Sequence, residues 1–399
     1  MDNSVFISYR RNVSGYPARA VFQALRFSGI DAFMDVESID SGQFDSIILG
    51  QIEARPYFLL LLAPGCLERC AEAGDWLRRE IEHAISTNRV IIPLLTSAFD
   101  FNANYAKPYL TGKLAKLPTF NALNVPLDYF DEAMNRLRTR FLKPIDLIST
   151  PTPKHDQAVV QRKIAQAESE PQVTETQLSA QEYFEQALAR PEDDLDTKIA
   201  DYDEALRLNP RYADALINRG NSLANKGNPK GAIADYNEVL RLNPLDADAY
   251  YNRGNTRYNQ NDLEGAIADY TKSIEYKNPQ LFYPYNNRGL ARAAQGDPDG
   301  AIADYNEAIS LNPQLGAAFY NRGLVRSSQG DLEGAIADYD EVLRLDPQSV
   351  AGYYNRGDAL KATGDLQGAC ADYHEALRLN TIASRAKALL KAIAETCRD

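Results

Sequence analysis

The segment DWLRREIEHAI, residues 75–85, places the only tryptophan of the chain, Trp76, four residues before a glutamate, Glu80. The segment has the pattern of a surface helix, and residues four apart lie on one face of a helix. Trp76 and Glu80 can therefore line one site, with a flat aromatic ring beside a carboxylate. Taken alone, the pair is a weak signal, because a glutamate among charged neighbours is usually a solvated side chain. Glu82 is a nearby rival.

Several familiar catalytic motifs are absent from the sequence. There is no GxGxxG after the first predicted strand, no P-loop, no HExxH and no GxSxG. Three histidines occur, at His83, His155 and His374, too few and too scattered to favour a histidine-based triad. Four cysteines occur: Cys66, Cys70, Cys370 and Cys397. Cys66 and Cys70 are four residues apart, but no His or Cys pair completes a zinc site with them, so we expect no metal and four free thiols in a reducing cytoplasm.

Composition limits the classes of function. The chain has 399 residues, of which 44% are hydrophobic, so it can bury the cores of two or three domains. Its formal net charge of −12 opposes a large phosphate-binding surface and hence a nucleic-acid partner. The first residues lack the pattern of a signal peptide, and no apolar run approaches the roughly 18 residues of a membrane helix. We therefore expect a cytoplasmic protein without a membrane partner.

The first 142 residues alternate short apolar runs with amphipathic stretches. Strands are predicted at residues 5–8, 31–35, 57–62, 90–94 and 119–123. Helices are predicted between and after them, at residues 16–27, 44–52, 67–86 and 129–141. This alternation predicts a flavodoxin-like α/β domain with a parallel sheet covered by helices on both faces. Ligands of such sheets bind beyond the carboxyl ends of the strands, where Tyr9, Arg10 and Arg11 follow the first strand.

The rest of the chain is a linker and a repeat. Residues 143–176 are rich in Pro, Ser, Thr and Gln and predict a linker with at most a short helix. From residue 177 onward, AIADY or a near copy recurs at intervals of 34 or 35 residues, ending at Tyr202, Tyr236, Tyr270, Tyr305, Tyr339 and Tyr373. We expect six repeats over residues 177–381 and a capping helix over residues 382–399. The period, the small residue of NRG and the closing proline resemble the tetratricopeptide repeat.

The repeat array predicts binding rather than chemistry. Each pair of helices must stack on the next to bury its apolar face, which gives an α-solenoid. Tyrosines of the NRG segments are expected on the concave face, where tyrosine supplies a large contact area at low entropic cost. Tyr251, Tyr320 and Tyr354 are therefore candidates for contacting a protein or peptide partner. Packing between adjacent helices is their alternative role, and the arginine of NRG is expected to pair within the array.

Four segments of the first domain together resemble the Toll/interleukin-1 receptor (TIR) domain, and most of all its NAD-cleaving branch. They are VFISYRR, AFMDVESIDSGQF, FLLLLAPGCLERC and DWLRREIEHAISTNRVIIPLL. The resemblance implies that Glu80 of W-x-x-x-E is the catalytic glutamate and that Trp76 stacks on nicotinamide. It also implies ligand contacts for Tyr9, Arg10 and Arg11. The loop from Asp35 to Gly42 would mediate self-association and gate the pocket.

The function that this resemblance implies is cleavage of the nicotinamide–ribose bond of NAD⁺. NAD⁺ would be the substrate, and no cofactor is required. The product would be ADP-ribose or a cyclic isomer of it, and the repeats would regulate the enzyme, with a role in immune (antiphage) defence. The alternative is a non-enzymatic TIR adaptor or scaffold in signalling. Glu80 favours the enzyme, because an adaptor does not need that carboxylate.

Overall fold

The computed structural model describes residues 2–34, 42–72, 74–145, 147, 150–154, 156–278, 280–380 and 383–397. The chain forms two compact units, Met1–Gly231 and Ala232–Asp399, and each is described by itself below. None of the helices within these ranges combines the length and the apolarity needed to cross a membrane.

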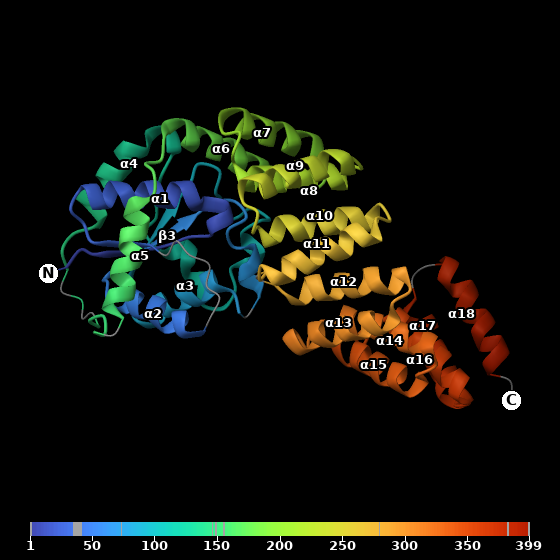
Figure 1. Cartoon of the computed structure of the whole chain (residues 1–399). Helices are drawn as coiled ribbons and strands as arrows, with labels where there is room; N and C mark the ends of the chain where they lie inside the picture. The colour runs from blue at the N-terminus through green and yellow to red at the C-terminus, as the bar shows by residue number, and fades with distance from the viewer. Residues whose placement is uncertain are drawn as a thin grey trace. The chain divides into compact units, whose positions relative to one another are not determined.

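The first unit contains the predicted parallel sheet. Its strands are β1 Val5–Ser8, β2 Ala32–Met34, β3 Tyr57–Leu62, β4 Val90–Leu95 and β5 Leu123–Asn124. They are arranged in the order β2-β1-β3-β4-β5, and every neighbouring pair is parallel (Figure 1). The α/β fold class predicted from the sequence is confirmed. All strand ends therefore meet at one edge, and the loops that follow the strands lie there.

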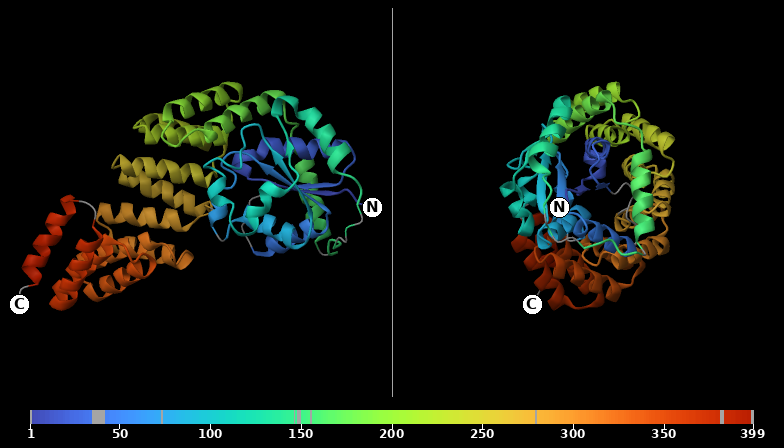
Figure 2. Two further views of the ribbon diagram at one scale, coloured as in Figure 1. Left: turned by 180° about the vertical axis from the view of Figure 1, so that it is seen from behind. Right: turned by 90° about the vertical axis from the view of Figure 1, so that its left-hand side faces the viewer.

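Alternate residues of the central strand supply two separate cores. Phe58 and Leu60 of β3 belong to one core, whereas Leu59 and Leu61 belong to the other. The first core is covered by α2 (Gly42–Glu53) and α3 (Trp76–Ser86), and the second by α1 (Arg11–Phe27) and α4 (Phe130–Arg136). Figures 1 and 2 show the sheet between these helices. Because both faces are buried, β3 is apolar throughout.

The segment expected to be a linker contains a packed helix. This helix, α5 (Gln157–Ser169), buries Val160 and Ile164 in the first core. Its last turn is also tied to the domain, because Glu168 forms an ion pair with Arg26 over 2.5 Å. The apolar stripe of α5 is short and flanked by polar, proline-containing sequence, so the pattern alone did not distinguish it from a linker. The first compact unit thus continues past the predicted domain end at residue 142.

The remaining helices form the predicted repeat pairs. Their bounds are α6 Glu175–Ala189, α7 Leu195–Leu208, α8 Ala213–Asn225, α9 Pro229–Leu242, α10 Ala247–Asn259, α11 Leu263–Glu275, α12 Phe282–Gln295, α13 Pro298–Leu311, α14 Gly316–Gln329, α15 Leu332–Leu345, α16 Val350–Thr363, α17 Leu366–Leu379 and α18 Ala383–Thr396. Helices α6 to α8 belong to the first unit and α10 to α18 to the second. The predicted capping helix corresponds to α18.

Within the second unit, glycine and tyrosine explain the close helix pairing. A Cβ added at Gly254 would lie 2.8 Å from Cε1 of Tyr270, and one at Gly289 would lie 2.7 Å from Cε1 of Tyr305. The AIADY tyrosine therefore packs directly on the backbone of the preceding helix, where no side chain fits.

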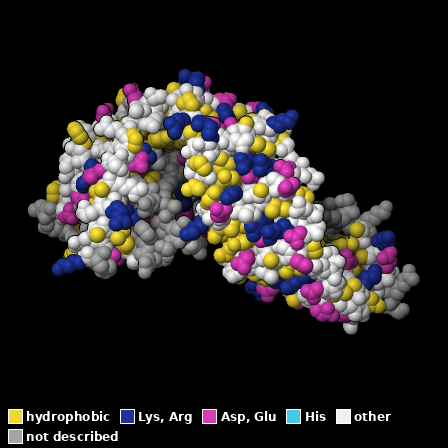
Figure 3. Space-filling model, in the orientation of Figure 1, with side chains coloured by type: hydrophobic (Ala, Val, Ile, Leu, Met, Phe, Trp, Pro, Cys, Tyr) yellow, Lys and Arg dark blue, Asp and Glu magenta, His cyan; other side chains and the backbone are white. Residues whose placement is uncertain are grey.

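Charges of both signs are interspersed over the face shown in Figure 3.

The cysteines differ from the expectation of four free thiols. Cys370 of α17 and Cys397 after α18 form a disulfide, with their Cα atoms 5.5 Å apart. They are separated by 27 residues in sequence, and only the return of α18 against α17 brings them together. Cys66 and Cys70 are free and buried. Burial raises the pKa of the Cys66 thiol to about 12, so it is an unreactive core side chain.

Candidate active site

Helix α3 carries the candidate catalytic glutamate to the carboxyl edge of the sheet. The helix begins at Trp76, and the Asp75 carboxylate caps it by accepting a 3.0 Å hydrogen bond from the backbone N–H of Arg78. One turn further on, Glu80 faces the last residue of β1. The Ser8 hydroxyl donates a hydrogen bond of 2.5 Å to Oε2 of Glu80. Glu80 is only 8% exposed, so its carboxylate lies in a site largely shielded from water.

A buried ion pair fixes α3 against the end of β1. The guanidinium of Arg10 donates to both carboxylate oxygens of Asp75 over 2.6 and 2.9 Å, and its Nε donates to the backbone carbonyl of Cys66 over 3.0 Å. Burial disfavours the Arg10 cation, but the hydrogen bonds and the charge of Asp75 outweigh burial, and the pKa of Arg10 is raised. Arg10 thereby ties the segment after β1 to two points of the connection between β3 and α3, the helix that carries Glu80.

The other predicted site residues of this domain occupy different environments. Trp76 is half-buried, and the Arg79 guanidinium lies over its ring at 4.4 Å from the centroid. A nicotinamide ring would have to use the other face or displace Arg79. Tyr9 packs against the second core. Glu82 forms a 2.9 Å ion pair with Arg78 on the outer side of α3, the role expected of an ordinary surface glutamate.

Part of the predicted site lies outside the described residues. Gly42 is the first residue of α2, and Arg11 is the first residue of α1. The side chain of Arg11 is not among those described, and neither is Asp35 nor the remainder of the segment 35–41. Ligand contacts for these residues remain predictions.

The first repeat helix, α6, covers the same edge of the sheet. The Gln181 amide donates to the backbone carbonyl of Val13, in the segment after β1, over 2.7 Å. The side-chain carbonyl of Gln181 in turn accepts from the hydroxyl of Tyr212, the residue before α8, over 2.5 Å. Leu188 lies beside Gly65 in the loop after β3, where an added Cβ would be 3.7 Å from its Cδ1. Helix α6 thus contacts the first turn of α1, which follows β1, and the loop that follows β3.

A third contact of α6 involves a buried acid, Glu185. This residue is 1% exposed, accepts a 3.0 Å hydrogen bond from Gln181 and lies beside Thr96, the residue after β4. Burial raises the pKa of Glu185 to about 7, although contacts with Thr96 and Gln181 oppose that rise. The acid therefore changes its charge near neutral pH. The sequence motifs did not indicate Ser8, Asp75, Gln181 or Glu185 as members of this region.

Two of the three predicted partner tyrosines line one cavity in the second unit. Tyr251, Tyr320 and Tyr354 are each half-buried, and each packs against an AIADY tyrosine with ring centroids 6.0–6.2 Å apart. A cavity of about 350 Å³ is lined by Tyr320, Val350, Ala351, Tyr354, Asn355, Ala388 and Leu389. The Asn355 amide donates to the Tyr320 hydroxyl over 2.9 Å. All three tyrosines pack within the array, and Tyr320 and Tyr354 also line a cavity, so contact with a partner remains a prediction.

Curated proteins similar to this chain are NAD⁺ hydrolases. The chain is 34% identical over 155 residues to the NAD(+) hydrolase sarm1 of Drosophila melanogaster. It is 30% identical over 165 residues to the NAD(+) hydrolase tir-1 of Caenorhabditis elegans. These matches cover 37% and 41% of this chain but only 11% and 16% of the two relatives. The similarity concerns the N-terminal domain and not the whole of either relative.

The second half of the chain matches models of the tetratricopeptide repeat. The matched residues are 199–241, 219–280, 283–315, 326–364 and 350–381. Among solved structures, YrrB, described as a TPR protein with an unusual peptide-binding site, is 23% identical, covers 48% of this chain and 97% of its own, and superposes with a TM-score of 0.40. The Pseudomonas aeruginosa protein pilF is 17% identical and covers 55% of this chain and 99% of its own, with a TM-score of 0.49.

Proposed function

We propose that this chain, which joins a TIR domain to tetratricopeptide repeats, hydrolyses the nicotinamide–ribose bond of NAD⁺. The products are nicotinamide and ADP-ribose, or a cyclic isomer when an adenine nitrogen replaces water. The observation that carries the proposal is the position of Glu80 at the carboxyl edge of the sheet, in the domain that resembles curated NAD⁺ hydrolases.

The chemistry requires little more than one well-placed carboxylate. Nicotinamide in NAD⁺ is already cationic and leaves as a neutral molecule without protonation. The ribose carbon then passes through a state that resembles an oxocarbenium ion, as in glycoside hydrolysis. Glu80 can stabilise this positive charge, and its shielded position strengthens the interaction. Trp76, one turn earlier on α3, is the candidate to stack on the nicotinamide ring.

Replacement of Glu80 by glutamine tests the assignment. Glu80→Gln retains the shape of the side chain, and the Ser8 hydroxyl can still hydrogen-bond to it. We expect NAD⁺ cleavage to fall about a thousandfold or more, which corresponds to roughly 4 kcal/mol of lost transition-state stabilisation. Product formation would be followed by chromatography and folding by thermal melting.

The matched control is Glu82→Gln, which removes an acid of the same helix that pairs with Arg78 instead of facing the sheet. This variant is expected to retain near-normal turnover. Equal activity of folded Glu80→Gln and wild-type protein would exclude Glu80 as the catalytic residue. Absence of NAD⁺ cleavage by the folded wild-type protein at high concentration would favour the alternative function, a non-enzymatic TIR adaptor.

Helix α6 gives the repeat array a means of regulating this site. It contacts the first turn of α1, which follows β1, and the residues that follow β3 and β4, all at the edge where a ligand of such a sheet binds. Glu80 is itself largely shielded from solvent in this structure. Substrate entry then requires the edge to open, and we assign α6 the role of holding the basal state closed.

Self-association is the second part of the proposed regulation, together with a role in immune (antiphage) defence through NAD⁺ depletion. Both rest on the resemblance to the enzymatic TIR branch, in which the loop corresponding to Asp35–Gly42 contributes to assembly. Specific activity of the wild-type protein should therefore rise with protein concentration. A dilution series monitored by light scattering and NAD⁺ loss would check this. Constant specific activity across the transition from oligomer to monomer would contradict it.

A further inference from the structure

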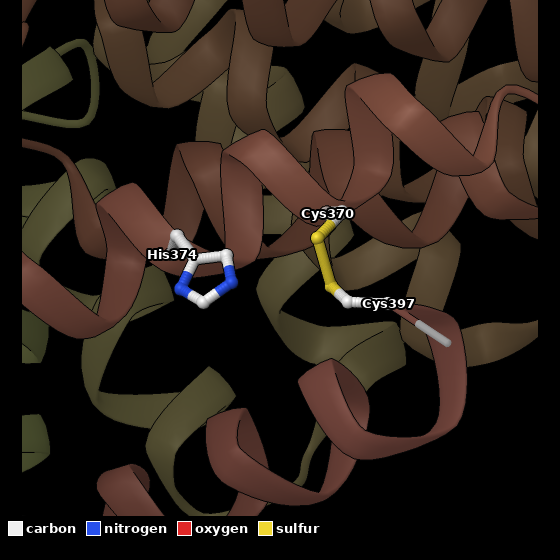
Figure 4. Close-up of side chains that lie close together, drawn as sticks. All are labelled: Cys370, His374 and Cys397. Atoms are coloured by element: carbon white, nitrogen blue, oxygen red, sulfur yellow. A yellow bond between two sulfur atoms is a disulfide. The ribbon is translucent and has the colours of Figure 1, made fainter. Parts of the chain in front are cut away.

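Three side chains with metal-binding chemistry converge at the last helix pair of the array. Cys370 and His374 lie four residues apart on α17 and so project from the same face of that helix. Cys397 follows α18. The sulfur atoms of the two cysteines and a ring nitrogen of His374 all lie within 4.8 Å of one another. Figure 4 shows the imidazole beside the bond between the two sulfurs.

The disulfide does not require a histidine beside it, whereas a metal site would use the imidazole of His374 as a ligand. Two thiolates and one imidazole are a ligand set that suits Zn²⁺, which binds sulfur at about 2.3 Å and nitrogen at about 2.0 Å. Tetrahedral geometry at these lengths separates the ligand atoms by roughly 3.5–3.8 Å. The two sulfurs, bonded to each other in the disulfide, must therefore move apart after reduction, whereas the ring nitrogen of His374 already lies within 4.8 Å of both. His374 is exposed, and the two cysteines are half-buried, so an ion can reach the cluster.

We propose that the reduced protein binds one Zn²⁺ ion through Cys370, His374 and Cys397, with water in the fourth position. The oxidised protein holds the same two cysteines as a disulfide. A dithiol reductant converts one state into the other. It transfers two electrons and two protons to the sulfur–sulfur bond and becomes a disulfide itself. Zn²⁺ then displaces the two thiol protons and binds the resulting thiolates.

The ion would keep α18 attached to α17 when the disulfide is reduced. Leu389 of α18 is 2% exposed and packs in the core that contains Tyr373. Leu389 also lines the 350 Å³ cavity together with Tyr320 and Tyr354. Either covalent or metal linkage therefore stabilises the helix that forms one wall of this cavity. The inference does not depend on the proposed NAD⁺ chemistry.

Cobalt is a direct probe of the site, because Co²⁺ replaces Zn²⁺ in such sites and gives a charge-transfer absorption only when thiolates bind it. The full-length protein would be reduced with a phosphine, freed of metal and titrated with Co²⁺ alone. We expect one equivalent of Co²⁺ to bind, with a thiolate charge-transfer band and a tetrahedral visible spectrum. Added Zn²⁺ should abolish both. Reoxidised protein should show neither.

Substitutions locate the ligands. Cys397→Ser should remove most of the charge-transfer band, and His374→Ala should weaken Co²⁺ binding at least about tenfold. His83→Ala is the matched control, since it removes a histidine that pairs with Glu53 in the other compact unit, and it should bind like wild type. Formation of the disulfide by oxidised His374→Ala, measured by mass spectrometry, would show that α17 and α18 still meet.

The wild-type spectrum decides the question even where a variant misfolds. Stoichiometric Co²⁺ binding without a thiolate band would overturn the proposal, as would absence of stoichiometric binding. Equal Co²⁺ affinity of His374→Ala and wild type would remove His374 from the site and would also overturn it.

Discussion

The first repeat and the later repeats carry opposite charges at one position of the repeat. The arginine of NRG occurs in each later repeat, as in Arg253 and Arg322, whereas the corresponding residue of α6 is Glu185. Arg253 pairs over 2.6 Å with Asp269 of its own repeat, and Arg322 pairs over 2.5 Å with Asp338. Glu185 instead faces the TIR domain. In the second unit, this helix position thus stabilises a repeat from within. In the first unit, it docks the first repeat onto the α/β domain.

The two environments also differ in how a buried carboxylate is stabilised. Asp269 and Asp338 are each 2% exposed, and each pairs with a second arginine one turn along the first helix, Arg257 and Arg326. Their charges are therefore compensated inside the array. Glu185 is held by the neutral amide of Gln181, and its pKa is raised to about 7. The docking contact of α6 is consequently sensitive to pH near neutrality.

The largest effect is expected when Glu185 of α6 is replaced by arginine, the residue that the later repeats carry at this position. This change should break the contact between α6 and the edge of the sheet. Glu185→Arg would place an uncompensated cation against Thr96, at a cost of at least about 3 kcal/mol. Once α6 has left this surface, the arginine can pair with Asp201, which lies 16 residues further on, as Asp338 does from Arg322, so the helix pair itself should survive. We expect faster hydrogen exchange in α6 and a several-fold rise in basal NAD⁺ cleavage, measured by mass spectrometry and by nicotinamide release.

The matched control inverts a charge inside the array. Arg322→Glu would place two acids together near Asp338, which should lower the melting temperature of the repeats without raising basal NAD⁺ cleavage. The proposed contrast between Glu185 and the arginines of the later repeats would be wrong if Glu185→Arg left α6 protected from hydrogen exchange and the basal rate of NAD⁺ cleavage unchanged. It would also be wrong if Arg322→Glu activated the enzyme to the same extent.

The pH dependence of docking should be the next largest effect. Docking raises the pKa of Glu185 from an ordinary value near 4.5 to about 7, so the docked state binds the proton more tightly. Docking is therefore fully stable below about pH 4.5, weakens as pH rises from about 4.5 to about 7, by roughly 2–4 kcal/mol in total, and does not change further above that range. Hydrogen exchange of α6, corrected for the intrinsic pH dependence, should accelerate between about pH 5 and about pH 7 and level off above it.

Glu185→Gln is the control for this titration, because it keeps the shape of the side chain and removes its charge. It should remain docked across the whole range, and its basal NAD⁺ cleavage should rise less with pH than that of wild type. Parallel pH profiles for the two proteins would show that a group other than Glu185 governs the change.

The sequence allowed prediction of what local patterns determine. The apolar runs of the strands predicted a parallel sheet, and the recurrence of AIADY predicted the helix pairs, because each pattern reflects burial within one element. The position of Glu80 on a helix was also predicted, within the helix expected at residues 67–86. These features need no knowledge of residues far along the chain.

Long-range contacts could not be inferred in the same way. Gln181 meets Val13 across 168 residues, and Cys370 meets Cys397 only because α18 turns back onto α17. One signal was present, since Glu185 replaces the arginine that the repeat register predicts. Its meaning depends on the surface that it contacts, and that surface belongs to a different part of the fold.

The smallest predicted effect concerns Tyr320 and separates partner contact from packing. Its ring lies 6.2 Å from that of Tyr339, and its hydroxyl accepts a hydrogen bond from Asn355, yet the residue also lines the 350 Å³ cavity. Half-burial limits its contribution to stability, so Tyr320→Ser should lower the melting temperature by only a few degrees. Peptides selected from a random display library on the wild-type protein provide a probe. Their binding should weaken by about 1–3 kcal/mol.

The control for Tyr320→Ser is Tyr283→Ser, a change at a tyrosine that is 39% exposed and lies outside the residues that line the cavity. It removes the same chemical group without altering the cavity wall, so the selected peptides should bind it as they bind wild type. Two other results would count against partner contact by Tyr320. Unchanged peptide affinity together with a large fall in the melting temperature of Tyr320→Ser would make Tyr320 a packing residue. Equal losses of affinity in both variants would show that the peptides recognise exposed tyrosines in general rather than this cavity.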